Sequence, residues 1–522
     1  MSPTVAEEAG RRRTFAIISH PDAGKTTLTE KFLLYGGAVQ EAGAVKARGE
    51  RRRVRSDWME MEQKRGISIT STVLQFPYRD HVLNLLDTPG HRDFSEDTYR
   101  VLAAADAAVM VLDGAKGIEP QTRKLFEVCR DRGVPLITFV NKWDRPSRPP
   151  LEVIDEVESQ LRLVPTPVTW PVGSAEAFAG LVDRRDTSYT RFTRVARGAG
   201  EAGEERLDIE AVDDDAALEE LDLLEAVGAE VDLETFWGGE STPVFFGSAL
   251  TNYGVRLLLD GVVDLAPPPS PRTSATGDVR ALDDPFSAFV FKVQANMDPS
   301  HRDRIAFVRV CSGRFERGMV VTHGATGKPF ATKYAHSVFG QDRETVDEAF
   351  PGDVVGFVNA TDVRVGDTLF ADPPVAYAGI PSFAPELFAT IRARDTSKFK
   401  QFRSGIKQLD EEGVVQVLRD PDMGDQAPML AAVGPMQFEV AVHRLENEFG
   451  APVELAPNNY KVARVTDEAS APSLRAMSGV RVLQRADGAW LALFESPYWL
   501  ARVEADQPEL RLDRLVAEGL AG

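Results

Sequence analysis

The chain has 522 residues, more than one hydrophobic core organises, so two to four domains are expected. Hydrophobic residues make up 43% of the chain and charged residues 27%, and this ordinary globular composition excludes wholesale disorder. A formal net charge of −20 would repel naked nucleic acid. Contact with an anionic partner therefore requires particular faces of the protein on which basic side chains are gathered locally.

The N-terminal residues Met1 to Glu8 lack the apolar core of a secretion signal, and no uninterrupted apolar run is long enough to span a bilayer. These observations predict a cytoplasmic protein that does not enter a membrane. The two cysteines, Cys129 and Cys311, are too few for a disulfide framework or a cysteine-bound metal cluster. Both are expected to be small buried apolar side chains.

Residues 1–265 have the pattern of an α/β domain. A short buried strand is predicted at Thr14–Ser19, and a helix follows it at Thr26–Leu34. The alternation continues with helical segments between strands and predicts a mostly parallel, doubly wound sheet. An insertion rich in Asp and Glu is predicted at 174–242. The further buried strands are predicted at 82–86, 107–112, 136–140 and 244–246.

The second half of the chain changes texture after a proline-rich linker predicted at 266–284. Short alternating segments separated by glycine-containing turns predict a small β-barrel at 285–375. Helices then return among strands, which predicts an α+β domain of the ferredoxin-like kind at 385–522. Its helices are predicted at 396–409 and 437–449, beside strands at 387–391 and 429–433.

Residues Ser19–Thr27 have the composition and position of a phosphate-binding loop between a strand and a helix. Lys25 is expected to reach the β and γ phosphates, and Thr26 to offer its hydroxyl to Mg²⁺. Ser19 replaces the usual first glycine, so this segment alone also allows an ordinary turn that caps a helix. The nucleotide-binding residues predicted in the loop are Asp22, Ala23, Gly24, Lys25, Thr26 and Thr27.

A second motif, Asp87–His91, follows the strand predicted at 82–86. Asp87 is expected to hold Mg²⁺ through water, and the N–H of Gly90 to sense the γ phosphate. A strand that simply ends in a Pro-Gly turn would explain the shape of this segment. It would not explain the aspartate and the histidine together.

Two further motifs predict which base the bound nucleotide carries. Asn141, Lys142 and Asp144 follow a strand, and the Asp144 carboxylate can accept hydrogen bonds from the guanine N1–H and exocyclic amine, a pair that adenine lacks. Ser248 and Ala249 follow the last strand and can place backbone N–H groups near the guanine carbonyl oxygen. All four motifs occur in order at strand ends of one sheet, where such folds bind nucleotides. The sequence therefore predicts a GTPase that binds GTP or GDP with Mg²⁺.

The segment Arg65–Thr70 together with Asp87–His91 resembles the ribosome-dependent GTPases of translation, whereas signalling GTPases generally have glutamine after that glycine. Within this group, Ser19–Thr27 and Phe399–Gly405 resemble the bacterial peptide chain release factor 3 family. The resemblance covers nearly the whole chain. It implies a G domain with an insertion, then a barrel, then the α+β domain.

The resemblance also implies an activity. The GTP form would bind the ribosome after peptide release, drive off the class 1 release factor and leave after hydrolysis. The implied partners are ribosomal RNA and proteins near the factor-binding site, and the chain itself is expected to be a monomer. His91 is expected to be the catalytic residue that positions the attacking water.

Other residue roles follow from the same resemblance. Ser68 lies where most of the family has a Mg²⁺-binding threonine, and serine preserves the hydroxyl. Pro21 and Ile67 would form an apolar gate beside His91, although Pro21 is equally explained as a turn residue. A run of arginines lies in the loop equivalent to the first switch, where contact with ribosomal RNA or ordering by the γ phosphate outweighs a solvated charge run. These arginines are Arg48, Arg51, Arg52, Arg53 and Arg55.

Two other functions are weighed against this one. An elongation-factor-like translocation GTPase would share the first part of the chain, but the length leaves no room for two more C-terminal domains. A ribosome-binding adapter that does not hydrolyse nucleotide belongs to a different class. Its nucleotide pocket would be a relic, which the complete set of predicted binding and catalytic residues disfavours.

Overall fold

The structure is a computed structural model of the chain. It describes residues 3–37, 46–47, 50–51, 71–193, 203–295, 304–339, 342–358, 360, 363–380, 383–421 and 424–515. The chain forms two compact units, which are described separately below. The first comprises 1–91, 98–291 and 305–378, and the second comprises 92–97, 292–304 and 379–522.

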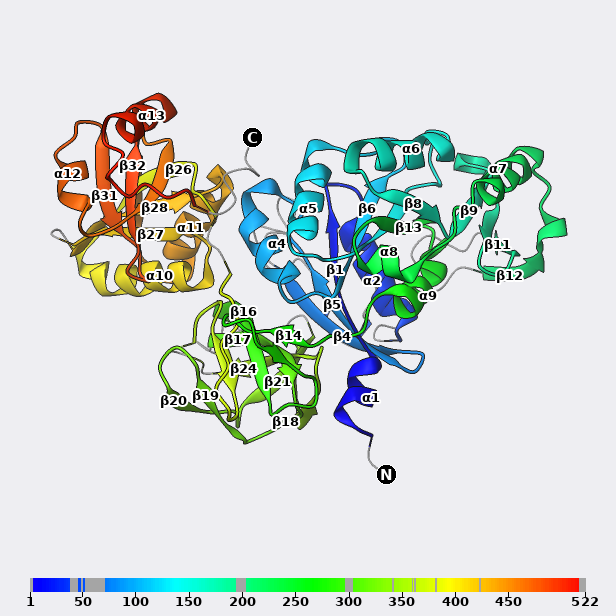
Figure 1. The fold of residues 1–522 in the computed structure, drawn as a ribbon, viewed down its shortest axis with the longest axis horizontal. Coiled ribbons are helices and arrows are strands. Elements are labelled where there is room, and N and C mark those ends of the chain that lie inside the picture. The colour runs from blue at the N-terminus through cyan, green and yellow to red at the C-terminus, as the bar shows by residue number, and fades with distance from the viewer. Residues whose placement is uncertain are drawn as a thin grey trace. The chain divides into compact units, whose positions relative to one another are not determined.

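The first unit is built on a seven-stranded sheet with the strand order β4-β5-β1-β6-β7-β13-β8 (Figure 1). All neighbouring strands are parallel except β4 and β5, which form an antiparallel hairpin. The run of buried side chains along β1 is typical of a strand covered on both faces. In chain order the strands are β1 (Arg12–Ser19), β4 (Thr72–Tyr78), β5 (His81–Asp87), β6 (Ala107–Asp113), β7 (Leu136–Asn141), β8 (Val164–Pro167) and β13 (Ser241–Phe246).

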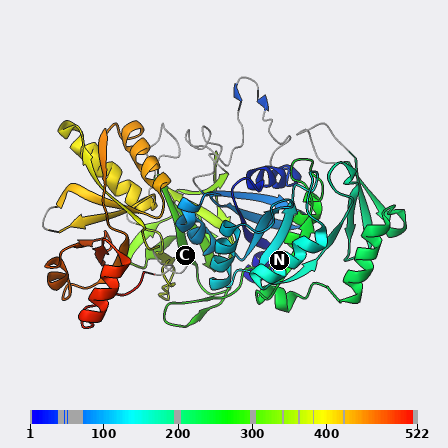
Figure 2. The ribbon, with the colours of Figure 1, turned by 90° about the horizontal axis from the view of Figure 1, so that it is seen from above.

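Helices cover both faces of this sheet. Figure 2 shows α2 on one face and α5 and α6 on the other. On the first face, α2 and α9 pack over Phe15 and Ile17 of β1, and Phe32 and Leu258 belong to the same buried cluster. The helices are α1 (Val5–Gly10), α2 (Lys25–Tyr35), α4 (Ser95–Leu102), α5 (Pro120–Asp131), α6 (Pro150–Leu161), α8 (Leu233–Trp237) and α9 (Val255–Leu265).

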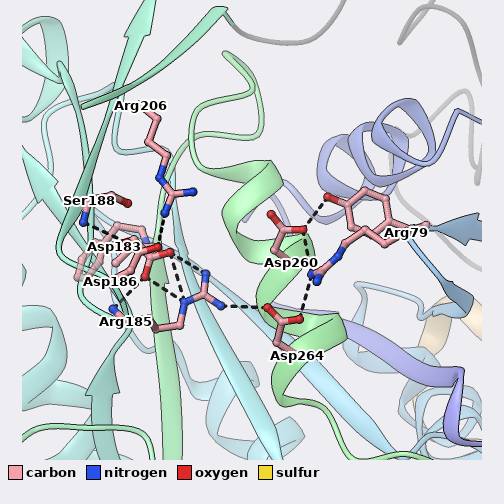
Figure 3. A network of polar contacts seen from close by, with 11 residues as sticks. Arg79, Asp183, Arg185, Asp186, Ser188, Arg206, Asp260 and Asp264 are labelled. Carbon is pink, nitrogen blue, oxygen red and sulfur yellow. Dashed lines mark hydrogen bonds and ion pairs between the residues drawn. The ribbon is translucent and has the colours of Figure 1, made fainter. Parts of the chain in front are cut away.

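A smaller antiparallel sheet, with the order β12-β11-β10-β9, lies between β8 and β13 in the sequence. Its apolar residues join the main domain in one core, in which Trp170 and Phe246 meet edge to face with ring centroids 5.5 Å apart. Figure 3 shows a polar network nearby, where Asp264 of α9 faces both Arg79 and Arg185. The elements are β9 (Thr169–Val172), β10 (Gly180–Asp183), β11 (Ser188–Thr193), β12 (Gly203–Asp208) and α7 (Asp215–Ala226).

An antiparallel eight-stranded sheet follows, with the order β20-β19-β25-β16-β17-β24-β21-β22. Buried Phe289, Phe291, Phe315 and Phe357 fill its interior. Before it, β14 (Arg272–Thr273) pairs with β15 (Val279–Arg280) inside the segment predicted as a linker. The eight strands of this sheet are β16 (Ser287–Ala295), β17 (Arg304–Ser312), β19 (Val320–His323), β20 (Lys328–Ala331), β21 (Ala335–Phe339), β22 (Asp342–Thr345), β24 (Val354–Val358) and β25 (Thr368–Phe370). Beside it, β18 (Phe315–Glu316) pairs with β23 (Glu348–Ala349) as a separate two-stranded sheet.

The second unit contains the ferredoxin-like arrangement. Its order β26-α10-β27-β28-α11-β29, with the strands side by side as β29-β26-β28-β27, is the βαββαβ motif, and β31, β32 and β30 extend the sheet. The elements are β26 (Leu387–Ala393), α10 (Phe399–Glu412), β27 (Gln416–Asp420), β28 (Gly424–Ala432), α11 (Pro435–Asn447), β29 (Val453–Pro457), β30 (Val462–Thr466), α12 (Ala471–Arg475), β31 (Val480–Gln484), β32 (Trp490–Phe494) and α13 (Pro497–Asp506).

The predicted fold class is confirmed: an α/β domain, a β-barrel and an α+β domain follow one another. Each predicted strand and helix has a counterpart whose ends differ by a few residues. Cys129 and Cys311 are both buried, as predicted. In the part of the chain that the structure describes, no helix is long and apolar enough to cross a membrane.

Candidate functional site

Four loops meet at the carboxyl edge of the first sheet. They follow β1, β5, β7 and β13, whose parallel pairing brings the ends of these strands to one edge. Pairing of Ile17 with Asp87 places the second motif next to the end of the strand that leads into the phosphate-binding loop. The Thr88 hydroxyl donates to the Ile17 carbonyl over 2.6 Å and fixes this neighbour relation. The predicted motifs thus share one site.

The phosphate-binding loop has the backbone shape that its glycine allows. Gly24 has φ of +101°, in a region that side chains rarely adopt, and it caps α2. A Cβ atom on Gly24 would also collide with Nδ2 of Asn141. Within the loop, Ala23 is buried and Asp22 is exposed with φ of +67°. Thr26 and Thr27 lie half-buried in the first turn of α2.

Lys25 and Asp87 form a buried ion pair at the centre of the site. Lys25 Nζ lies 2.5 Å from Asp87 Oδ1, and both side chains are at most 5% exposed. A lysine in this loop provides charge for phosphates, and an aspartate at this strand end provides an oxygen for a hydrated cation. The pair brings a cationic group and a carboxylate together at this sheet edge, and their roles toward phosphate and Mg²⁺ remain predictions.

Asn141 links the phosphate-binding loop to the loop after β13. Its Nδ2 donates to the Ala23 carbonyl over 2.7 Å, and its Oδ1 accepts from the Ala249 N–H over 2.9 Å. Ser248 is buried, and its N–H donates to the Tyr253 carbonyl over 2.9 Å. The hydrogen bond to Asn141 therefore places the Ala249 N–H in the site. The Ser248 N–H is instead hydrogen-bonded to Tyr253 in its own loop.

Asp144 offers an acceptor suited to guanine. Its Oδ1 is buried and has no hydrogen-bond partner among the residues that the structure describes. The preceding Trp143 is 1% exposed, packs edge to face on Phe246 with centroids 4.9 Å apart, and donates from Nε1 to the Gly173 carbonyl. A buried acceptor without a partner is costly, and a ligand that donates hydrogen bonds would remove that cost.

Lys142 is held by a residue that the sequence reasoning missed. Its Nζ donates to Asp113 Oδ2 over 2.8 Å, and its backbone has φ of +66°. Burial raises the pKa of the Asp113 carboxyl, but the Lys142 ammonium and the Ala115 N–H outweigh burial, so the net pKa is lowered. Asp113 is the last residue of β6, at the same sheet edge, and that position was the signal available in the sequence.

His20 is a second residue of the site that the prediction left without a role. It is 1% exposed, with Nε2 2.9 Å from Glu119 Oε2 and Nδ1 3.5 Å from the Thr122 hydroxyl. Burial lowers the pKa of His20, which favours the neutral ring. His20 Nε2 nevertheless has no hydrogen-bond partner among the described residues, so its approach to Glu119 is a close contact without hydrogen-bond geometry. The ring of His20 thus lies against Glu119 and Thr122 at the start of α5.

Gly90 and His91, the last two residues of the Asp87–His91 motif, lie half-buried just before the short 3-10 helix at Arg92–Phe94. Their position agrees with the prediction, and their roles remain predictions. Ser68 and Ile67 lie outside the described residues, as does most of the arginine run. Of that run, Arg51 is described only as part of the short strand β3 (Glu50–Arg51), which pairs with β2 (Lys46–Ala47).

Three family models match consecutive parts of the chain. The model of the elongation factor Tu GTP binding domain matches residues 10–268, and that of elongation factor G domain 2 matches 285–372. The model of the class II release factor RF3, C-terminal domain, matches 377–504. The first match spans the sheet and all four motifs, so the chain carries a GTPase domain that binds GTP or GDP.

Curated relatives match over nearly the whole chain. "Peptide chain release factor 3" of Synechococcus elongatus is 51% identical, with 99% of this chain and 95% of the relative covered. The protein of the same name from Gloeobacter violaceus is 50% identical, with 98% and 99% covered. A crystal structure from Thermus thermophilus has a similar fold, with a TM-score of 0.70 at 24% identity, covering 93% of this chain and 73% of that one. The chain belongs to the peptide chain release factor 3 family of translational GTPases.

Proposed function

We propose that the protein is a ribosome-dependent GTPase that promotes dissociation and recycling of class 1 release factors after peptide release. The observation that supports the guanine site most directly is the buried acceptor Oδ1 of Asp144, beside the loops that Asn141 joins. Two guanine donors, N1–H and the exocyclic amine, suit this carboxylate. The choice of GTP over ATP would rest on that pair of hydrogen bonds.

The phosphate end of the site would be held by the residues around the Lys25–Asp87 pair. In this proposal Lys25 turns to the β and γ phosphates, and the backbone N–H groups of the loop surround the phosphate oxygens. Thr26, Asp87 and Ser68 would hold Mg²⁺ through their oxygens. That ion would neutralise charge that develops on the phosphate oxygens during transfer.

His91 is proposed to orient the attacking water. It stands next to Gly90, whose N–H is proposed to meet the γ phosphate. Phosphoryl transfer depends mainly on positioning and charge stabilisation, so one well-placed side chain suffices for this role. Contact with the ribosome would turn His91 toward the γ phosphate and so couple hydrolysis to the correct partner.

The termination role is supported by relatives that match nearly full length and by the family model of the C-terminal domain. These matches favour termination over translocation. We infer that the protein works in the cytoplasm as a monomer and meets ribosomal RNA and proteins near the factor-binding site.

The test uses post-termination ribosomes that carry a fluorescent class 1 release factor. Addition of the protein with GTP is expected to accelerate dissociation of the labelled factor, whereas GDP is expected to have little effect. Asp144→Asn serves as the control, because it should act only when xanthosine triphosphate is supplied. An unchanged dissociation rate, measured with protein that hydrolyses GTP on ribosomes, would overturn the termination role.

A further inference from the structure

One short segment of the chain, residues 92–97, belongs to the second unit although its neighbours in sequence belong to the first. The segment begins directly after His91, and the chain returns to the first unit at Thr98. Its 3-10 helix, Arg92–Phe94, packs on α11, and Asp93 is buried. The histidine proposed to orient the attacking water is therefore followed at once by residues that fold with another part of the chain.

The Asp93 carboxylate lies at the N-terminus of α11. Its Oδ2 accepts a hydrogen bond from the Met436 N–H over 2.8 Å. The free N–H groups and the dipole of a helix make this end positive, so a carboxylate is favourable there. The first turn of α11 has no acidic residue of its own. Asp93, 343 residues earlier in the chain, thus supplies a negative charge that the helix lacks.

Gly434, just before the first residue of α11, leaves the space that this carboxylate needs. Its backbone is extended, with φ of −144° and ψ of 162°, which any residue can adopt. A Cβ atom on Gly434 would collide with the carboxyl group of Asp93. Glycine is therefore required at this position by the close approach of Asp93 and not by the backbone conformation.

His91 lies between two fixed points of the backbone. On one side, the Thr88 hydroxyl is bound to the Ile17 carbonyl in the first unit. On the other side, Asp93 is bound to α11 in the second unit, with only Arg92 between it and His91. Two residues of extended chain span at most about 7 Å, so the Asp93 contact restricts where the His91 backbone can lie. A change at this contact is therefore passed to His91.

We propose that Asp93 is a positioning residue for GTP hydrolysis: it anchors the chain after His91 to α11, so that the placement of His91 depends on the second unit. The inference rests on the proposed function, because it takes His91 as the residue that orients the attacking water. Asp93 itself touches neither nucleotide nor water in this role. Loss of the contact frees the chain beyond His91, so the histidine is less often where the water requires it, while the nucleotide-binding loops are unaffected.

Gly434→Ala tests the contact without altering Asp93, His91 or the nucleotide site. Its methyl group displaces the Asp93 carboxyl, and hydrolysis is measured in single turnovers with saturating ribosomes, so that binding and chemistry are separated. The stimulated rate is expected to fall by about 10- to 100-fold, because misplacement of a reacting group by about 1 Å costs up to about 10²-fold. GTP affinity and ribosome affinity are expected to stay nearly unchanged. The control is Gly379→Ala in the same unit, where an added Cβ atom meets no other atom within 4 Å and the rate should not change.

A double-variant cycle tests whether Gly434 acts through Asp93. Asp93→Ala removes the anchor, so the stimulated rate should fall, and adding Gly434→Ala should then cause no further loss. Asp93→Asn keeps an oxygen that accepts from the Met436 N–H and is expected to recover part of the rate lost in Asp93→Ala. Losses from Asp93→Ala and Gly434→Ala that multiply in the double variant would show two independent effects and would overturn the proposal.

A helix cap that serves only stability predicts a different result. Each variant of Asp93 and Gly434 would then unfold at a lower denaturant concentration, while the folded protein hydrolysed GTP on ribosomes at the rate of the Gly379→Ala control. That pattern would overturn the positioning role and leave the proposed function standing. If the unmodified protein shows no ribosome-stimulated hydrolysis, the proposed function fails, and the role of Asp93 fails with it.

Discussion

At the scale of single residues, guanine recognition depends on the Asp144 carboxylate. Replacement by asparagine puts an NH₂ donor in place of one acceptor oxygen, so one of the two guanine donors would face another donor. Asp144→Asn is expected to weaken GTP affinity by about 10²-fold or more, on the scale of one or two charge-assisted hydrogen bonds. It should also shift preference toward xanthosine nucleotides. Competition binding with both nucleotides tests this, and a variant that still prefers guanine would exclude Asp144 from base recognition.

His91 allows binding and chemistry to be separated. His91→Ala is expected to leave GTP and Mg²⁺ binding nearly unchanged while ribosome-stimulated hydrolysis falls by about 10²-fold or more, the usual cost of losing one positioned group. The variant should still displace the class 1 factor and then remain on the ribosome. Nucleotide affinity, single-turnover phosphate release and ribosome residence time are measured on one preparation.

The opposite pattern for His91→Ala would show a purely structural histidine. In that case nucleotide binding would weaken and the melting temperature would drop, while stimulated hydrolysis by the bound fraction would stay near normal. Such a result would remove His91 from the catalytic role.

The sequence could locate the motifs but not the contacts between them. The order of residues around Lys25, Asp87 and Asp144 is a local pattern, and parallel strands bring such patterns to one edge. The two hydrogen bonds of Asn141, one to Ala23 and one from Ala249, join segments more than a hundred residues apart, so only tertiary structure reveals them.

At the scale of elements, the insertion β9–β12 is attached by an apolar core and by the polar network of Figure 3. Trp170 is fully buried, whereas Arg79 and Asp264 keep 50% and 40% of their side-chain surface accessible. Trp170→Ala is expected to lower the free energy of unfolding by about 3–5 kcal/mol. Asp264→Asn should lower it by less than about 1 kcal/mol, since exposed ion pairs are weak.

The free energies of unfolding of the two variants, measured by denaturant titration, show whether the apolar core or the polar network holds the insertion in place. A larger loss for Asp264→Asn than for Trp170→Ala would mean that the polar network, and not the core, holds the insertion.

Asp410, in the last turn of α10, makes the second unit sensitive to pH. Burial raises the pKa of Asp410 to about 6, against the opposing effects of the Val417 N–H and Arg419. The folded state therefore holds the proton more tightly than the unfolded state, and the resulting stability, complete below about pH 4, is lost as pH rises through about 6. Asp410→Asn keeps an acceptor for the Val417 N–H, which lies 2.8 Å from Asp410.

The asparagine variant is expected to match the natural protein near pH 4 and to exceed its free energy of unfolding by up to about 3 kcal/mol at pH 8. Denaturant midpoints of the second unit's transition across this range provide the measurement. A difference between the two proteins that does not vary with pH would contradict a titration at Asp410.

The elements themselves were largely predictable, since buried strands and amphipathic helices carry strong periodic signals. The strand predicted at Thr14–Ser19 is β1, which begins two residues earlier because Arg12 already pairs with Val82 of β5. The buried Arg12 side chain is paired with Glu8 and Asp353. Val82 and Asp353 belong to different parts of the chain, so local pattern could not anticipate this extension. The strands β30 to β32 were missed as sheet partners for the same reason, because pairing across long loops has no local signature.

At the scale of the whole molecule, a buried ion pair joins the GTPase domain to the barrel within the first unit. Arg309 of β17 donates to both oxygens of Asp106, over 2.6 and 2.7 Å, and to the Ala104 carbonyl. Burial raises the pKa of Asp106 despite this arginine. Arg309→Met would leave the carboxylate buried without its main cationic partner, and the expected loss is about 3–5 kcal/mol at pH 7.

The matched control is the double variant Asp106→Asn, Arg309→Met, which removes the buried charge and should recover part of the loss. The deficit of the single variant should also shrink as pH falls, because a protonated Asp106 needs no cation. Unfolding at several pH values measures both effects, and an additive double variant would show that the two side chains do not interact.

The position of β13 in the sheet determines when the guanine site can form during synthesis of the chain. β13 lies between β7 and β8, yet β7 ends at Asn141 and β13 begins only at Ser241. During translation the phosphate-binding loop therefore emerges long before Ala249, whose N–H bonds to Asn141. A nascent chain can form the early strands one by one, but its base pocket closes only when this late strand is inserted. Nucleotide capture is thus a late event in the production of the protein, and a chain truncated before residue 249 carries phosphate-binding residues without a finished guanine site.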